Sequence, residues 1–279
     1  MPEMPEVEII RRHLDKKLTG KKIEDIEILL PRQLKAPASP EAFSEMCCGL
    51  AVLGMERRGK YLLMRLEGEI RILFHLRMTG SLVYVEAGEA YENAHTRAIF
   101  CLEDGSRLYF ADIRTFGVIC GLRPGELENV KGLAEMGPEP LSQEFTADYL
   151  YAAAQRTRMP VKNLLLDQRK IGGIGNIYAD EALFLAHVHP QRQADSLSRE
   201  ECGKLQQAVN QVIEDGIRDG GTTFRDYRNG EGGKGSHQEH LYVYHRQGEP
   251  CRECGVLIEY MKVGGRGTHY CPMCQRPLP

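Results

Sequence analysis

The stretch CRECGVLIEYMKVGGRGTHYCPMC, residues 251–274, holds two C-x2-C pairs, Cys251 with Cys254 and Cys271 with Cys274. Sixteen residues separate the pairs, which suits a hairpin with one pair on either side of it. Two such knuckles supply four soft thiolate ligands in a tetrahedron and leave no open position for catalysis. The spacing therefore predicts one structural Zn2+ ion.

The hairpin between the cysteine pairs presents Lys262 and Arg266 among three glycines. Glycine lets a backbone approach a phosphate closely, and an arginine can donate two hydrogen bonds to it. A zinc hairpin with Arg266 near its tip is typical of a DNA-binding element, although a solvated surface arginine has the same pattern.

A second glycine-rich stretch, GGIGNIY at residues 172–178, leads into a predicted helix. Unpaired N–H groups at a helix start suit an anion, but a structural glycine turn looks the same in sequence. Just upstream, five cations surround a single acid, Asp167. They are Arg156, Arg158, Lys162, Arg169 and Lys170. A local cationic excess of this kind is what phosphate contacts require.

The rest of the chain divides by its apolar patterning. Residues 5–18 have the spacing of an amphipathic helix, and residues 22–122 contain eight short β-type runs, which predicts an antiparallel sandwich or barrel. The runs are residues 23–30, 51–58, 60–67, 70–76, 81–86, 97–104, 106–113 and 116–122. The stretch EMGPEPLS, residues 135–142, breaks both kinds of pattern and marks a boundary.

Beyond this boundary the pattern predicts helices at residues 146–155, 161–168, 176–186 and 198–218. A glycine-rich loop at 227–240 has no apolar periodicity and is predicted to be mobile and functional, and residues 241–255 are predicted to form a strand leading into the cysteines. We therefore expect an α+β multidomain protein: a β-sandwich with a leading helix (1–134), a linker (135–142), a helical domain (143–240) and a zinc hairpin (241–279).

The overall charge excludes a uniformly basic nucleic-acid coat. The 279 residues carry 36 Lys and Arg against 39 Asp and Glu, a formal net charge of -3, so any DNA binding must come from local clusters. No run of about 18 apolar residues is present, and the acidic start MPEMPEVEII does not resemble a signal peptide. We expect a cytoplasmic protein without membrane contact.

The N-terminus offers a nucleophile if Met1 is removed. The chain then starts with the secondary amine of Pro2 next to the carboxylate of Glu3. An N-terminal amine titrates near ~8, so part of it is neutral at cellular pH and can attack a sugar C1′ to form an iminium ion. An ordinary frayed terminus has the same two residues.

Several motifs occur in one order along the chain. They are MPEMPEVE, RRGKYLL, HLRMTG, ADIRTFG, MGPEPLS, IGGIGNIYADEALF, GGTTFRDY, LYVYHRQGEPC and GRGTHYCPMCQR. Together they resemble the formamidopyrimidine-DNA glycosylases, the bacterial 8-oxoguanine repair enzymes. This resemblance spans Pro2 to Arg276 and implies a β-sandwich, a helix-two-turn-helix domain around Gly173 to Tyr178, a zinc finger, and a capping loop for the lesion within 143–240.

The resemblance also implies the chemistry. Pro2 is expected to form a Schiff base with the deoxyribose and Glu3 to be the acid/base beside it. Lys60 matches the lysine that assists β-elimination, and Arg266 matches the finger arginine assigned to δ-elimination.

The resemblance implies DNA contacts as well. His95, Lys162 and Asn176 match backbone-contacting positions, as does Arg114, and Arg158 lies near another. Met78 and Phe116, with Arg114, match the side chains that fill the gap left by a flipped base. A base must leave the duplex before an enzyme can reach it, so such wedge residues have a physical purpose.

We therefore expect a bifunctional DNA glycosylase and abasic-site lyase that removes oxidised purines from double-stranded DNA as a monomer at the bacterial nucleoid. One alternative is the endonuclease VIII branch of the same superfamily, which prefers oxidised pyrimidines. Another is a zinc-finger protein that binds DNA without catalysis.

Overall fold

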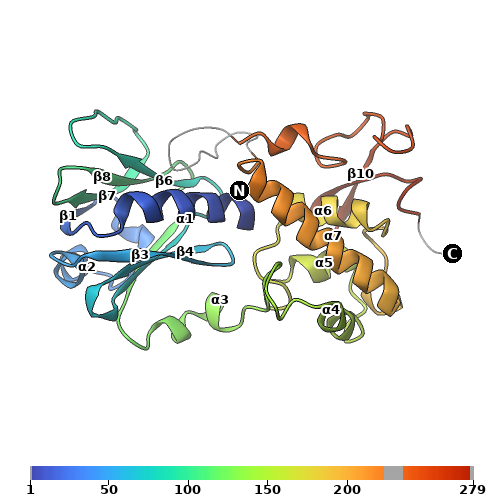
Figure 1. Ribbon diagram of the computed structural model, residues 1–279, viewed down its shortest axis with the longest axis horizontal. Coiled ribbons are helices and arrows are strands. Elements are labelled where there is room, and N and C mark those ends of the chain that lie inside the picture. Colours follow the sequence, from blue (N-terminus) through green and yellow to red (C-terminus); the bar gives the residue numbers. More distant parts are fainter. Residues whose placement is uncertain (1, 223–234, 277–279) are drawn as a thin grey trace. The chain divides into compact units, whose positions relative to one another are not determined.

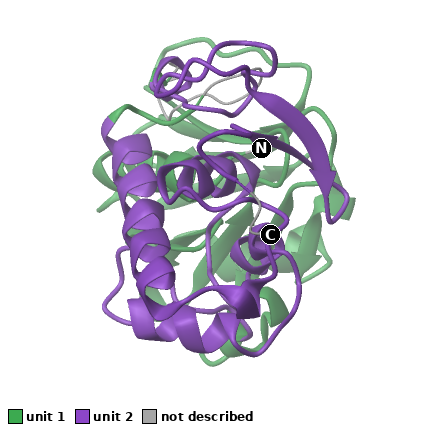
Figure 2. Ribbon diagram, turned by 90° about the vertical axis from the view of Figure 1, so that its right-hand side faces the viewer, with its two compact units in different colours: residues 1–134, 219–236 green, residues 135–218, 237–279 purple. Residues whose placement is uncertain are grey.

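The computed structural model describes residues 2–222 and 235–276 (Figure 1). The chain forms two compact units, residues 1–134 with 219–236 and residues 135–218 with 237–279 (Figure 2). Met1 and residues 227–234 of the predicted capping loop lie outside the described residues. The sequence predicted a finer division of the chain after residue 134, into a linker (135–142), a helical domain (143–240) and a zinc hairpin (241–279). This finer division stays a prediction.

The first unit is a sandwich of two sheets, as predicted. One sheet has the strand order β1 (Ile23–Ile28), β7 (Thr96–Leu102), β8 (Arg107–Asp112), β6 (Gly80–Val85). The other has the order β2 (Leu34–Ala36), β9 (Val118–Leu122), β5 (Arg71–His75), β4 (Tyr61–Leu66), β3 (Val52–Arg58). Neighbouring strands are antiparallel except β2 and β9. Phe74 of β5 lies 5.6 Å from Phe100 of β7, ring centre to ring centre, so the core fills the space between the sheets.

Helix α1 (Met4–Leu18) closes one side of this sandwich. Its apolar residues Val7, Ile10 and Leu14 recur at helical spacing and are buried in the sandwich core. The helix contacts β3 and β6, the edge strands of the two sheets. Packing against both edges therefore determines where the N-terminus of α1 lies in this unit.

Two further helices of the first unit were not predicted. Helix α2 (Pro40–Cys47) starts with Ser39, whose hydroxyl accepts the Ala42 N–H at 3.3 Å, followed by proline at the first helical position. This Ser-Pro pair is a recognised helix-start signal. Helix α3 (Lys131–Ala134) follows a 3-10 turn (Leu127–Asn129), and both pack on the outer face of the second sheet.

The second unit combines helices with the predicted hairpin. All four predicted helices are confirmed as α4 (Ala147–Ala154), α5 (Val161–Leu166), α6 (Asn176–Leu185) and α7 (Arg199–Arg218). Helix α6 is buried along almost its whole length and packs on α5 and α7. Strands β10 (Glu259–Val263) and β11 (Arg266–Tyr270) pair in antiparallel fashion. Among the helices of the described residues, none has the length and apolar character needed to cross a membrane.

The strand predicted for residues 241–255 is wrong. Residues 241–249 form bends and turns instead of pairing with a neighbouring strand. The cause is the buried Glu181 carboxylate of α6, which accepts the N–H groups of Tyr242 (2.7 Å), Val243 (2.9 Å) and Tyr244 (2.8 Å). In a strand, consecutive N–H groups point to opposite sides, so three that converge on one carboxylate cannot belong to a strand.

Candidate functional site

The predicted site residues divide between the two units. The first unit carries Pro2, Glu3, Lys60, Met78, His95, Arg114 and Phe116. The second carries Arg158, Lys162, Asn176, Arg266 and the four cysteines. Each group is described within its own unit.

The predicted nucleophile and acid/base lie just before α1. Glu3 is the N-cap residue of the helix and is only 2% exposed. Its N–H donates to Glu6 Oε2 at 2.8 Å, while Glu6 Oε1 accepts the N–H of Thr222 at 2.8 Å. Glu6 therefore joins the start of α1 to the chain just before the predicted capping loop, a link that sequence reasoning missed.

Lys60 lies in the tight turn between β3 and β4. Arg58 pairs with Tyr61, so Gly59 and Lys60 alone form the turn, and Gly59 has the positive φ of 57° that favours glycine. On the neighbouring strand His75 faces Tyr61, with their rings edge to face at 4.4 Å. Burial, followed by the positive charges of Arg77 and Lys60, lowers the pKa of His75 to about 3. The neutral ring accepts the Arg77 N–H at Nδ1, at 3.0 Å.

Glu8 connects α1 to the strand that leads to Lys60. Its carboxylate accepts hydrogen bonds from Arg11 (2.9 Å), Arg12 (2.8 Å) and Arg57 of β3 (3.0 Å). Burial raises the pKa of Glu8, but the hydrogen bonds from these arginines outweigh it and lower the pKa to about 2. The helix that begins after Pro2 and Glu3 is thus tied to β3 three residues before Lys60.

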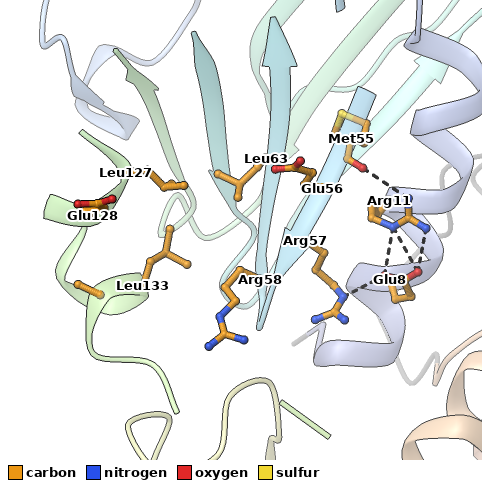
Figure 3. Close-up of a pocket in the computed structure, with 11 residues that line it drawn as sticks. Glu8, Arg11, Met55, Glu56, Arg57, Arg58, Leu63, Leu127, Glu128 and Leu133 are labelled. Carbon is orange, nitrogen blue, oxygen red and sulfur yellow. Dashed lines mark hydrogen bonds and ion pairs between the residues drawn. The ribbon is translucent and has the colours of Figure 1, made fainter. Parts of the chain in front are cut away.

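A cavity of about 790 Å³ adjoins this network (Figure 3). Glu8 and Arg11 lie on one side of it, and Leu127 and Leu133 lie on the other. None of the predicted site residues lines this cavity, so it is separate from the predicted chemistry.

The three predicted wedge residues lie on two loops of the first unit. Met78 is 41% exposed and Phe116 is 54% exposed. Their local sequence patterns would also fit residues of the hydrophobic core, but neither side chain is buried there. The Arg114 guanidinium lies 5.0 Å from the centre of the Phe116 ring, a cation–π contact. Ile113, which precedes Arg114 in the chain, is also exposed (51%), although the sequence did not single it out.

Buried Asp112 joins the two wedge loops. Its carboxylate accepts the hydroxyl of Thr79 at 2.5 Å and the N–H of Gly117 at 2.7 Å, and the Thr79 hydroxyl in turn accepts the Arg114 N–H at 2.9 Å. The Asp112 N–H also donates to the carbonyl of His95 at 2.9 Å. Predicted wedge and backbone-contacting residues are therefore brought together around Asp112, the first through its carboxylate and His95 through its N–H.

In the second unit Asn176 and Arg266 lie close together. Asn176 is the first residue of α6, and its Nδ2 donates to the carbonyl of Gly267 at 2.9 Å. Arg266 precedes Gly267 at the start of β11 and is exposed. Arg158, whose side chain is 86% exposed, lies 3.4 Å from Asp195 in an ion pair that solvent screens.

The predicted backbone contact of Lys162 is corrected by the structure. Its side chain is wholly buried, and its ammonium lies 2.5 Å from the carboxylate of buried Asp180. It also donates to the carbonyl of Gly267 at 2.9 Å and to the hydroxyl of Thr268 at 2.8 Å. A wholly buried ammonium that is paired with a carboxylate inside its own unit is not presented to a phosphate at the surface.

The four C-terminal cysteines converge. Their sulfur atoms all lie within 4.8 Å of one another, with Cys251 and Cys274 at 3.9 Å and Cys254 and Cys271 at 3.4 Å. Four thiolates at these spacings are the donor set and geometry of a closed zinc site. The N–H of Cys271 donates to Gln275 Oε1 at 2.9 Å, which orients the second knuckle. The cluster is thus positioned to bind one structural Zn2+ ion.

Comparison with known proteins agrees with this geometry. Three family models match, the formamidopyrimidine-DNA glycosylase N-terminal domain at residues 1–119, its H2TH domain at 136–228, and the zinc finger found in FPG and IleRS at 248–277. A formamidopyrimidine-DNA glycosylase of Pelotomaculum thermopropionicum is 46% identical over 276 residues, 99% of each chain.

Solved structures agree as well. The MutM (Fpg) protein of Thermus thermophilus is 40% identical, with a TM-score of 0.89 over the whole of both chains. A variant of the Lactococcus lactis protein in complex with DNA containing Fapy-dG is 33% identical, with a TM-score of 0.92 over 99% of this chain and 100% of that one. The chain belongs to the formamidopyrimidine-DNA glycosylase family.

Proposed function

We propose that this protein is a bifunctional DNA glycosylase and abasic-site lyase that removes oxidised purines, namely 8-oxoguanine and formamidopyrimidines, from double-stranded DNA. The observation that supports this most directly is the placement of Pro2 and Glu3 at the start of α1, with Glu8 tying that helix to the strand before Lys60. The DNA in the L. lactis complex, which contains Fapy-dG, supports the purine substrate.

The chemistry follows from these groups. The Pro2 nitrogen forms a bond to C1′ while the bond from C1′ to the base breaks, and Glu3 transfers the protons that this exchange requires. The positive end of the α1 dipole disfavours positive charge on the amine, which keeps it nucleophilic. Glu3 then donates a proton to O4′, so that the C1′–O4′ bond breaks and the opened sugar carries the iminium. Lys60 assists loss of the 3′ phosphate by β-elimination from this iminium, and Arg266 assists loss of the 5′ phosphate by δ-elimination.

The predicted DNA-contacting residues of both units suit the DNA side of the reaction, and all of those considered next are exposed except Asn176, which is half-buried. Met78 and Phe116 fill the gap left by the flipped nucleotide, while Arg114 pairs with the base left opposite. His95, Arg158 and Asn176 contact the phosphate backbone, which positions the duplex without reading its sequence. We further propose that the protein works as a monomer on chromosomal DNA, in the cytoplasm at the nucleoid.

Borohydride trapping on DNA with an abasic site tests the nucleophile. Pro2→Gly, or a terminus blocked by a retained Met1, should lose the trapped adduct and still bind the DNA, because the secondary amine forms the iminium. Glu3→Gln should lose base excision by roughly 10²–10⁴-fold, the range for a positioned acid/base. Pro5→Ala, at the other proline of MPEMPEVE, is the matched control and should trap normally. Undiminished trapping with a blocked terminus would refute the assignment.

A panel of duplexes separates the two branches of the superfamily. Excision of 8-oxoguanine and formamidopyrimidines in preference to oxidised pyrimidines is expected. The reverse order would assign the protein to the endonuclease VIII type of activity, and trapping without excision of any damaged base would leave only a lyase.

A further inference from the structure

The outer edge of β11 is held by side chains of α6. Asn176 Nδ2 donates to the carbonyl of Gly267 at 2.9 Å, and Asp180 Oδ2 accepts the N–H of His269 at 2.9 Å. Four residues of helix rise about 6 Å and two residues of strand rise about 6.6 Å, so the two spacings match. Helix α6 therefore pairs with the free edge of the hairpin through side chains where a neighbouring strand would use its backbone.

Lys162 of α5 completes this contact from inside the unit. Its ammonium bridges Asp180 (2.5 Å) to the Gly267 carbonyl (2.9 Å) and the Thr268 hydroxyl (2.8 Å). Both members of the pair are 0% exposed. A buried ion pair is costly to break on one side, because the remaining charge is left without a partner. The pair and the hairpin edge are thus one structural unit.

The tip of the hairpin is held as well. Gly264 has a φ of +55°, and a Cβ built on it would lie 1.9 Å from Asn163 Nδ2 of α5, so the backbone there packs directly on the helix. The backbone therefore contacts the neighbouring helices on both sides of Arg266: at Gly264 before it, and at Gly267 and His269 after it. None of these contacts uses the Arg266 side chain, which stays exposed.

We propose that the buried Lys162–Asp180 pair is a positioning element for Arg266, holding the β11 edge so that the guanidinium meets the reacting phosphate in one orientation. This inference rests on the proposed role of Arg266 in δ-elimination. Asp180 was not among the residues predicted from the sequence. Loss of the pair changes the second elimination selectively, since Pro2 and Lys60 belong to the other unit.

The test is the ratio of δ-product to β-product on duplex DNA with an abasic site, measured with the zinc-loaded full chain together with its Tm. Asp180→Asn should lower the Tm and reduce the δ-product share several-fold, with the β-elimination rate close to wild type. The double variant Asp180→Asn with Lys162→Met has no unpaired buried charge, so its Tm should recover. Its δ-product share should stay low, because the ammonium no longer holds the Gly267 carbonyl.

If the Lys162–Asp180 pair only stabilises the fold, the δ-product share should recover together with the Tm in the double variant. That result, or a wild-type share in Asp180→Asn, would overturn the inference. Glu201→Gln is the matched control, because it breaks the Arg192–Glu201 ion pair of the same unit, whose side-chain hydrogen bonds among the described residues involve no residue of β11 and neither Lys162 nor Asp180. It should lower the Tm and leave the product ratio unchanged.

Arg266→Gln in the same assay separates the inference from the function on which it rests. It should reduce the δ-product share at least as far as Asp180→Asn does. An unchanged ratio in Arg266→Gln would remove the proposed role of Arg266 and the inference with it. A reduced ratio in Arg266→Gln beside an unchanged one in Asp180→Asn would remove the inference alone.

Discussion

His75 illustrates at the scale of one residue how a fold changes a side chain's chemistry. His75 is buried, and its ring contacts the ring of Tyr61. Lys60 precedes Tyr61 in the chain and lies in the turn between β3 and β4. Burial and the nearby positive charges lower the pKa of His75 to about 3, against a usual value near 6.5. The folded protein therefore keeps His75 neutral at pH values where the unfolded chain binds a proton.

This difference predicts an acid-sensitive stability. As the pH falls from about 6.5 toward 3, the unfolded chain gains a proton at His75 that the folded chain does not, so the free energy of unfolding should fall by up to about 1.4 kcal/mol per pH unit. His75→Gln should flatten the profile between pH 6.5 and 4. Urea denaturation followed by circular dichroism measures this, with exposed His95→Gln as the control. Parallel profiles for wild type and His75→Gln would contradict it.

At the scale of an element, the zinc hairpin depends on long-range anchors as well as on its own ligands. Before Cys251, the Glu181 carboxylate accepts the N–H groups of residues 242–244. After Cys271, Gln275 accepts the Cys271 N–H, and its Nε2 donates to the Val188 carbonyl at 3.0 Å. The hairpin is short, with five residues in each strand, and two-stranded ribbons are marginal by themselves. Metal binding therefore contributes directly to its folding.

Removing one zinc ligand should disorder this element. Cys251→Ser or Cys274→Ser is expected to release stoichiometric zinc and to abolish DNA binding, because a closed four-thiolate site supplies folding free energy. Metal analysis and a binding assay measure the two effects. Cys202→Ser, at a buried cysteine of α7 outside the cluster, is the control and should keep its zinc. Purified wild-type protein without stoichiometric zinc would exclude the structural role.

At the scale of the whole molecule, a chain of net charge -3 must bind DNA through local cations. The basic residues that the resemblance implies at the DNA or at the reacting sugar are Lys60, His95, Arg114, Arg158, Lys162 and Arg266. Burial removes Lys162 from this group, because its charge is already matched by Asp180. The remaining residues include Arg158, whose single ion pair is exposed and weak.

A salt titration tests this revised set. Each phosphate contact contributes ~0.9 to the slope of log affinity against log salt, so Arg158→Ala should lower the slope by about one on damaged and undamaged duplex alike. Arg114→Ala should instead reduce the preference for damaged DNA, because its proposed partner is the base left opposite. Arg199→Ala, an exposed arginine of α7 paired with Asp148, is the control and should change neither. A wild-type affinity that does not depend on salt would exclude binding by local cations.

Local patterns in the sequence were enough to determine the zinc ligands, the hairpin, eight of the nine strands described in the first unit, α1 and the four helices of the second unit. In each case the signal is a spacing of residues within one short segment, such as C-x2-C or an apolar repeat, and it acts over a few residues. The Ser-Pro start of α2 was also readable, and it was overlooked. The three-residue strand β2 was not predicted.

Only the tertiary structure decided which charged residues are buried and what they hold. Lys162 looked like its exposed neighbour Arg158 in sequence, but its partners in β11 lie 105 and 106 residues away. The alternation in LYVYH indicated a strand until Glu181, 61 to 63 residues earlier, took its N–H groups. The free energy of a buried charge depends on the atoms around it in space, and residues so distant in the chain leave no mark on its local pattern.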